Sequence, residues 1–121
     1  MGAALARLHT ATGSRYGLER DNAIGATPQP NAPSDVWPDF WRERRLGFQL
    51  DRALENGHAG RLQDRGRRLL ERVPAFFGGY RPLPSLLHGD LWTGNRAMLA
   101  DGTPVIFDPA VYYGDREADL A

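Results

Sequence analysis

Three oxygen-bearing side chains near the C-terminus have the types and the spacing that phosphoryl transfer needs. Asp90 and Asn95 are five residues apart and flank a tight loop that contains Gly94, so both can point into one cleft. Asp108 follows 18 residues after Asp90, and we expect a hairpin turn to bring it back beside that loop. A carboxylate can accept the proton of an attacking hydroxyl, while an amide oxygen and a second carboxylate can hold Mg²⁺ on phosphates.

A short β-hairpin is predicted to position Asp108. Residues 97–99 and 105–107 are short apolar stretches, and Asp101-Gly102 between them is a common hairpin turn. The rest of the chain has helical spacing or turn-rich composition. We therefore expect a mostly α fold with one small hairpin, rather than a fold built on a sheet.

Three stretches predict helices. Residues 3–10 place Leu5, Leu8 and His9 on one face, and a second helix begins after Ser34 and Asp35. The apolar side of this second helix consists of Trp37, Phe40, Trp41, Phe48, Leu50, Ala53 and Leu54. The third helix has an apolar stripe of Leu62, Leu69, Leu70 and Val73 and is predicted to end at Pro74.

Two further segments are unusual in composition. Residues 13–33 are rich in Gly, Pro and Asn, which predicts a loop that is long for a compact domain. The third helix also carries five arginines, at positions 61, 65, 67, 68 and 72. These favour a solvated face interleaved with Asp64 and Glu71, and an anion-binding surface is the alternative.

Composition excludes several kinds of chemistry. All 15 basic residues of the 121 are arginine, so the chain has no lysine for a Schiff base or a phosphate-binding loop. It has no cysteine for a disulfide or a thiolate. The formal net charge is zero, which argues against a nucleic-acid partner. The longest apolar runs are far shorter than a membrane span, so we expect a cytoplasmic protein without a membrane partner.

The motifs around the three oxygen-bearing side chains resemble those of a known superfamily. His88-Gly89-Asp90-x4-Asn95, with Asp108, resembles the catalytic loop and metal-binding aspartate of protein kinase-like enzymes. Gly89 stands where protein kinases have arginine, and residues 114–121 resemble the small-molecule branch with aminoglycoside phosphotransferases and choline kinases. Residues 88–95 and 107–120, together with motifs in 21–31 and 37–49, are most similar to the fructosamine kinase (ketosamine 3-kinase) family.

The resemblance implies an activity and assigns roles to residues. The activity is ATP-dependent phosphorylation of the 3-hydroxyl of ketosamines, either small molecules or glycated protein lysines, which leads to protein deglycation. Asp90 is expected to be the base, and Asn95 and Asp108 the Mg²⁺ ligands. His88 is expected to brace the loop, and Asp119 to accept hydrogen bonds from its backbone.

Two assignments within the resemblance stay open. Trp92 is predicted to offer its face to the sugar ring of the substrate, with packing in the core as the alternative. The polar loop from Asn22 to Asn31 could recognise the acceptor or could brace the structure. Pro109-Ala110 replaces the Phe-Gly that follows the metal-binding aspartate of protein kinases, so no switch through that phenylalanine is expected.

The resemblance also implies that much of a kinase is absent from these residues. A full member has an N-terminal lobe with a phosphate-covering glycine-rich loop and a strand lysine, and neither motif occurs here. Residues 1–121 therefore correspond to a partial C-terminal lobe, with a family-specific loop at 13–33 and the catalytic loop and metal-binding hairpin at 87–109. We expect this chain to be inactive alone. The alternatives are a non-catalytic remnant, a module that needs a partner lobe, or another small-molecule kinase.

Overall fold

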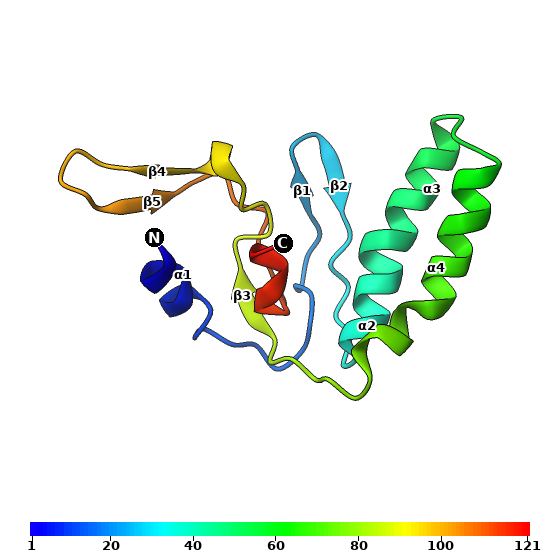
Figure 1. The fold of residues 1–121 in the computed structure, drawn as a ribbon, viewed down its shortest axis with the longest axis horizontal. Coiled ribbons are helices and arrows are strands. Elements are labelled where there is room, and N and C mark those ends of the chain that lie inside the picture. The colour runs from blue at the N-terminus through cyan, green and yellow to red at the C-terminus, as the bar shows by residue number, and fades with distance from the viewer.

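A computed structural model describes all 121 residues, and Figure 1 shows an elongated molecule with two different ends. The hairpin of β4 (Arg96–Met98) and β5 (Pro104–Ile106) forms one end, and helices α3 (Phe48–Glu55) and α4 (Arg61–Phe77) form the other. The remaining strands are β1 (Asn22–Ile24), β2 (Thr27–Gln29), β3 (Ser85–Leu87) and β6 (Tyr112–Gly114). The remaining helical elements are α1 (Gly2–Leu8), α2 (Trp37–Phe40), the π-helical η1 (Trp41–Gly47) and the 3₁₀ turns η2 (Thr93–Asn95) and η3 (Arg116–Asp119).

The strands form three separate antiparallel pairs, whereas the sequence predicted one. The β4–β5 hairpin is confirmed, with Arg96 opposite Ile106. A second hairpin, β1–β2, lies inside the segment predicted as a loop. The third pair joins β3 to β6 across 24 intervening residues, with Leu87 opposite Tyr112. Strands of three residues are too short to show an alternating pattern. The Asp101-Gly102 turn revealed β4–β5, whereas β1–β2 has no such turn sequence and β3–β6 is not a hairpin.

The predicted helices are present, although their interiors and ends differ from expectation. The stretch predicted to begin at Trp37 is helical through Glu55, but its middle, η1, is wound as a π-helix. Pro74 does not end the third helix as predicted, because α4 continues to Phe77 and stops at Gly78, whose φ is 44°. Phe77 packs against the core, and this contact favours continuing the helix past the proline. No helix has the length and apolar composition needed to cross a bilayer.

The core of the molecule is mainly aromatic and lies where the central strands meet α2. It consists of Tyr16, Trp37, Phe40, Leu87 and Tyr112, all buried. The rings of Phe40 and Tyr112 stack with centroids 5.7 Å apart, and Trp37 stacks on Phe40 at the same distance. Because Leu87 directly precedes His88, this core anchors the start of the predicted catalytic loop.

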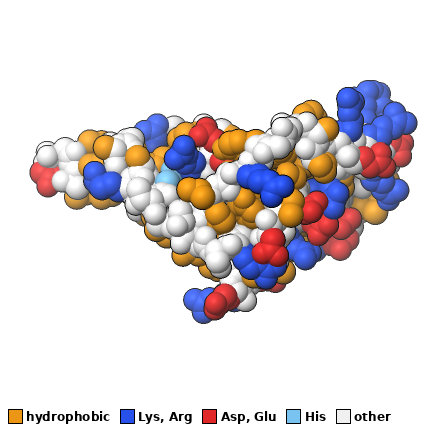
Figure 2. Space-filling model, turned by 90° about the horizontal axis from the view of Figure 1, so that it is seen from below, with side chains coloured by type: hydrophobic (Ala, Val, Ile, Leu, Met, Phe, Trp, Pro, Cys, Tyr) orange, Lys and Arg blue, Asp and Glu red, His pale blue; other side chains and the backbone are white.

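The arginines of α4 gather at the α3–α4 end of the molecule (Figure 2). All five are exposed, as the sequence predicted. Asp64 and Glu71 lie among these arginines in the sequence, but neither forms an ion pair with them. Figure 2 also shows hydrophobic side chains scattered over the opposite end, around the β4–β5 hairpin.

Candidate active site

The loop that follows β3 brings Asp90 and Asn95 into direct contact. The side-chain amide nitrogen Nδ2 of Asn95 donates to both the backbone oxygen and the carboxylate Oδ2 of Asp90, at 2.9 Å each. Asn95 is only 6% exposed, and Asp90 is half-buried. Because both donations come from Nδ2, the amide oxygen of Asn95 points away from the carboxylate and stays available for another ligand.

The β4–β5 hairpin returns Asp108 to the same place. The backbone N–H of Phe107 donates to the carbonyl of Asn95 at 3.1 Å, and the carbonyl of Asp108 lies 3.5 Å from Nδ2 of Asn95. Asp108 is the one non-glycine residue with a left-handed backbone, at φ 56°, and its side chain is exposed. Such a conformation costs about 1–3 kcal/mol and is concentrated at functional sites. The structure thus brings the three sequence-predicted residues together.

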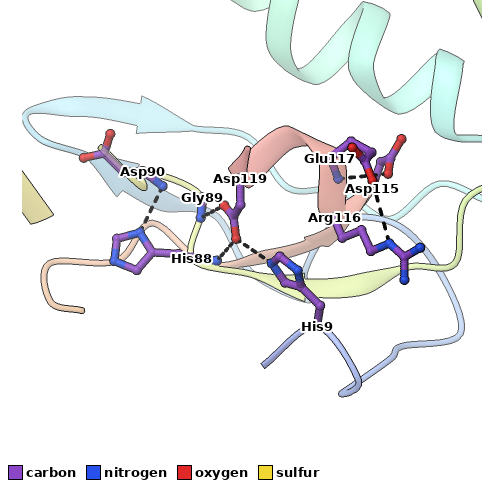
Figure 3. A network of polar contacts seen from close by, with 8 residues as sticks. All are labelled: His9, His88, Gly89, Asp90, Asp115, Arg116, Glu117 and Asp119. Carbon is purple, nitrogen blue, oxygen red and sulfur yellow. Dashed lines mark hydrogen bonds and ion pairs between the residues drawn. The ribbon is translucent and has the colours of Figure 1, made fainter. Parts of the chain in front are cut away.

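Asp119, at the end of η3, holds the backbone at the start of the catalytic loop (Figure 3). Its carboxylate accepts the backbone N–H of His88 through Oδ2 and that of Gly89 through Oδ1, both at 2.9 Å. Oδ2 also lies 2.9 Å from Nε2 of His9. The backbone contacts expected of Asp119 are therefore present. The His9 contact was not predicted, since it joins residues 110 positions apart.

His88 is buried and both of its ring nitrogens are engaged. Nδ1 accepts the backbone N–H of Asp90 at 3.3 Å, so it carries no proton. Nε2 then carries the proton and donates to the carbonyl of Phe107 at 3.0 Å. The ring therefore ties the catalytic loop to the residue before Asp108, and neither nitrogen is free for a substrate.

Gly89 allows the catalytic loop to approach the segment after Asp108. Its φ is 80°, and a Cβ at this position would overlap the carbonyl oxygen of Ala110. The backbone N–H of Ala110 in turn donates to the carbonyl of His88 at 2.9 Å. The absence of a side chain at Gly89 is what permits this packing, and any larger residue would be strained here.

Trp92 lies on the surface and not in the core. It is 59% exposed, and its indole covers Gly94 so closely that a Cβ there would overlap the ring. Within residues 1–121 Trp92 is therefore not packed in a core, and its contact with a sugar ring stays a prediction. The exposed ring lies two residues after Asp90, on the same loop.

The polar side chains of the Asn22–Asn31 loop point inward. Nδ2 of Asn22 donates to the carbonyl of Val111 at 2.8 Å, and Nε2 of Gln29 donates to that of Ala110 at 3.0 Å. Asn31 is fully buried. Asn22 and Gln29 brace the segment that follows Asp108, and Asn31 supports them by donating to Oδ1 of Asn22.

Comparison with known proteins gives a consistent result. A family model described as fructosamine kinase matches residues 1–121. A Synechocystis protein named "Probable ketoamine kinase" is 52% identical over 122 residues, which cover all of this chain and 40% of the relative. A rice (Oryza sativa subsp. indica) protein named "Protein-ribulosamine 3-kinase, chloroplastic" is 45% identical, over 99% of this chain and 36% of the relative.

Solved structures agree with the sequence matches. A Thermobifida fusca crystal structure described as a "putative fructosamine-3-kinase" superposes with a TM-score of 0.85 and 36% identity, covering 98% of this chain and 41% of that chain. A crystal structure from Haemophilus somnus with the same description superposes with a TM-score of 0.83 and 35% identity, covering 96% of this chain and 38% of that chain. The resemblance drawn from the motifs is confirmed, and the chain spans about two fifths of the length of these relatives.

Proposed function

The chain belongs to the fructosamine kinase family, and we propose that a full-length protein carrying these residues phosphorylates the 3-hydroxyl of ketosamines with ATP. The observation that carries the proposal is the double contact of Asn95 with Asp90, with the backbone of Asp108 beside it. Residues 1–121 would form part of the C-terminal lobe of this kinase. The acceptors would be small ketosamines or glycated lysines of proteins, and phosphorylation would begin protein deglycation.

Asp90 is the general base in this proposal. The oxygen of the acceptor hydroxyl bonds to the γ-phosphorus of ATP, its proton passes to the carboxylate of Asp90, and the bond from the γ-phosphorus to ADP breaks. The hydrogen bond from Asn95 fixes one oxygen of that carboxylate, Oδ2, and leaves the other for the hydroxyl. Orientation of this kind places the base within reach before the reaction begins.

Asn95 and Asp108 would hold Mg²⁺. Both offer oxygen ligands, Asp108 is exposed, and the amide oxygen of Asn95 has no hydrogen bond within the chain. Mg²⁺ is usually held by one or two carboxylates, with its other positions left to phosphates and water. When bound, Mg²⁺ would neutralise charge on the phosphates.

The remaining site residues would act on the acceptor or on the loop. Trp92 would stack against the sugar ring, which its exposure supports. His88 and Asp119 would act only through the backbone of the loop, since their polar atoms are taken by protein groups. The hydrogen bonds that Asp119 forms with His9, His88 and Gly89 are consistent with a structural role.

Residues 1–121 alone would be inactive, because they contain no lysine and no glycine-rich loop to hold the α- and β-phosphates. The same feature favours a second candidate for the isolated chain, a non-catalytic remnant or a module that needs a partner lobe. An aminoglycoside or choline kinase is the other alternative within the superfamily.

The test is an ATP-dependent assay on a full-length protein and on residues 1–121, with fructosyl-lysine, an aminoglycoside and choline as acceptors. We expect turnover of fructosyl-lysine by the full-length protein only, and loss of it in Asp90→Ala. Preference for choline or the aminoglycoside would overturn the acceptor class. Full activity of Asp90→Ala would overturn the kinase mechanism.

A further inference from the structure

Arg45 is a cation that lies against two aromatic rings and forms no ion pair with a carboxylate. It lies in the π-helical η1, and its guanidinium carbon is 4.0 Å from the centroid of the Tyr112 ring and 4.6 Å from that of Phe40. Burial lowers the pKa of Arg45 below its ordinary value, and the neighbouring Tyr112 offsets part of this effect. Its Nε is enclosed and has no hydrogen-bond partner. Asp21 also favours the charged form of Arg45, but the two residues form no ion pair, and a partly buried charge without a direct ion pair calls for an explanation.

One side of the guanidinium holds the loop that carries β1 and β2. Nη1 donates to the carbonyl of Pro30 at 2.6 Å, and Nη2 donates to Oδ1 of Asn31 at 2.8 Å. The amide nitrogen of Asn31 in turn donates to Oδ1 of Asn22 at 2.8 Å, and Gln29 donates to the same oxygen at 2.9 Å. Arg45 thus fixes the far end of a relay of buried amides.

That relay ends on the backbone next to Asp108. Asn22 and Gln29 donate to the carbonyls of Val111 and Ala110, which follow Asp108 by three and two residues. The N–H of Ala110 donates to the carbonyl of His88 at 2.9 Å, so the relay reaches the catalytic loop as well.

The other side of the guanidinium reaches the catalytic loop through Tyr112. Tyr112 pairs with Leu87 in the β3–β6 ladder, and Leu87 immediately precedes His88. Arg45 is therefore linked to the site in two ways, through the side-chain amides that begin at Asn31 and through Tyr112 in the β3–β6 pair. They meet at residues 88–90 and 108–110, which carry the general base and a metal ligand of the proposed function.

We infer that Arg45 is a positioning residue, which sets the place of Asp108 relative to Asp90 without touching a substrate. The inference rests on the proposed function for its catalytic consequence. A planar guanidinium can lie against aromatic rings while donating to two acceptors, whereas a lysine ammonium can replace only part of this. Misplacement of catalytic groups by about 1 Å can cost about 100-fold in rate, so a residue outside the site can matter.

The first test is kinetic and uses a full-length protein with Arg45→Met, Arg45→Lys and the matched control Arg44→Met. Arg44 lies in the same segment, and its side chain forms no hydrogen bond or ion pair. We expect Arg45→Met to lower kcat about 10- to 100-fold with KM for ATP and ketosamine changed less than threefold, and Arg45→Lys to restore part of the loss. Arg44→Met should stay within twofold of the parent. A folded Arg45→Met protein with the parent's kcat would overturn the inference.

The second test needs no activity and compares backbone amide NMR signals. We expect the signals of Gly89 and Asp108 to shift in Arg45→Met and to stay unchanged in Arg44→Met. Unmoved signals in the folded Arg45→Met protein overturn the inference, whether or not the parent is a kinase. If the signals shift in Arg45→Met but the parent protein has no kinase activity, the structural link is supported and the proposed function is not. If Arg45→Met does not fold, both kcat and the amide signals are measured on Arg45→Lys, for which we expect smaller changes in the same direction.

Discussion

The central part of the molecule and the α3–α4 arm are held by different kinds of contact. In the centre, directional polar bonds join residues far apart in the chain, such as His9 with Asp119 and Asn22 with Val111. In the arm, Leu50 of α3 packs against Gly66 of α4, and the bonds of Gln63 to the carbonyls of Leu50 and His58 join residues only 13 and 5 positions apart. Directional bonds fix atoms in place, whereas apolar helix packing tolerates small shifts. We therefore expect substitutions in the centre to change catalysis and those in the arm to change little.

The largest effect is expected for Asp90→Asn in a full-length protein. The amide can still accept the hydrogen bond from Asn95, so the loop should keep its shape and substrate affinity should be nearly unchanged. It cannot accept a proton, and loss of a general base costs about 10²- to 10⁴-fold in rate. The measurement is kcat with ATP and fructosyl-lysine, beside KM for each. Full kcat in this variant would remove the basis for the kinase assignment.

Two glycines provide a matched comparison of the centre with the arm. Ala at Gly89 must hold a φ of 80° and would overlap the carbonyl oxygen of Ala110, so we expect a loss of about 3 kcal/mol of unfolding free energy. Ala at Gly66 would overlap the δ-carbons of Leu50, but these end a flexible side chain that can shift, and the gain in helix propensity of about 1 kcal/mol offsets the crowding.

Urea denaturation of both variants measures this difference. Gly66→Ala should lie within about 1 kcal/mol of the parent, and Gly89→Ala should be destabilised well beyond that. Equal losses in the two variants would contradict the distinction between a rigid centre and a tolerant arm.

The same distinction explains what could be predicted from the sequence. Helical periodicity identified all three helical regions, and spacing together with the predicted hairpin turn identified Asp90, Asn95 and Asp108 as neighbours. The contact of His9 with Asp119 and the position of Arg45 could not be predicted, because each depends on segments far apart in sequence and linked by buried polar groups. Pro74 misled the prediction because the contact of Phe77 with the core outweighs a local helix-breaking preference.

The Asp108→Asn variant should show whether Asp108 acts as a metal ligand or as a base. Asparagine tolerates the left-handed backbone at φ 56° well, so this variant should keep the fold. A neutral oxygen replaces a charged one, and we expect the Mg²⁺ concentration for half-maximal rate to rise about tenfold, with part of the rate recovered at high Mg²⁺. Titration of the rate with Mg²⁺ tests this. The Asp90→Asn protein is the control, and Mg²⁺ should not rescue it.

Trp92→Ala should weaken acceptor binding with little change in ATP binding. The exposed indole can stack on a sugar ring, and its loss should raise KM for the ketosamine about tenfold, which corresponds to about 1.4 kcal/mol. Trp92→Phe is the matched variant, since it keeps an aromatic face. An unchanged KM together with a lower melting temperature would show that Trp92 serves stability alone.

The smallest effect, and of opposite sign, is expected in the arm. Arg65 and Arg68 are exposed, three residues apart on α4, and neither forms an ion pair, so their charges repel. Each also lies four residues from a further arginine, Arg61 or Arg72, and like charges four residues apart destabilise a helix by about 0.2–0.5 kcal/mol, an effect that salt screens. The double variant Arg65→Gln/Arg68→Gln should therefore raise the melting temperature by about 1–3 °C at low salt, not at high salt, and leave kcat within about twofold.

Arg52→Gln is the matched control in the same arm. Arg52 is an exposed arginine that does form an ion pair, with Glu55 on α3, so its loss removes an attraction where the double variant removes a repulsion. We expect its melting temperature to be unchanged or slightly lower at low salt, because exposed pairs contribute about 0–1 kcal/mol. Changes of opposite sign in the melting temperatures of the two variants would be explained by surface charge alone. A fall in kcat on replacing Arg65 and Arg68 would instead mean that the arm takes part in the reaction, and the division between centre and arm would fail.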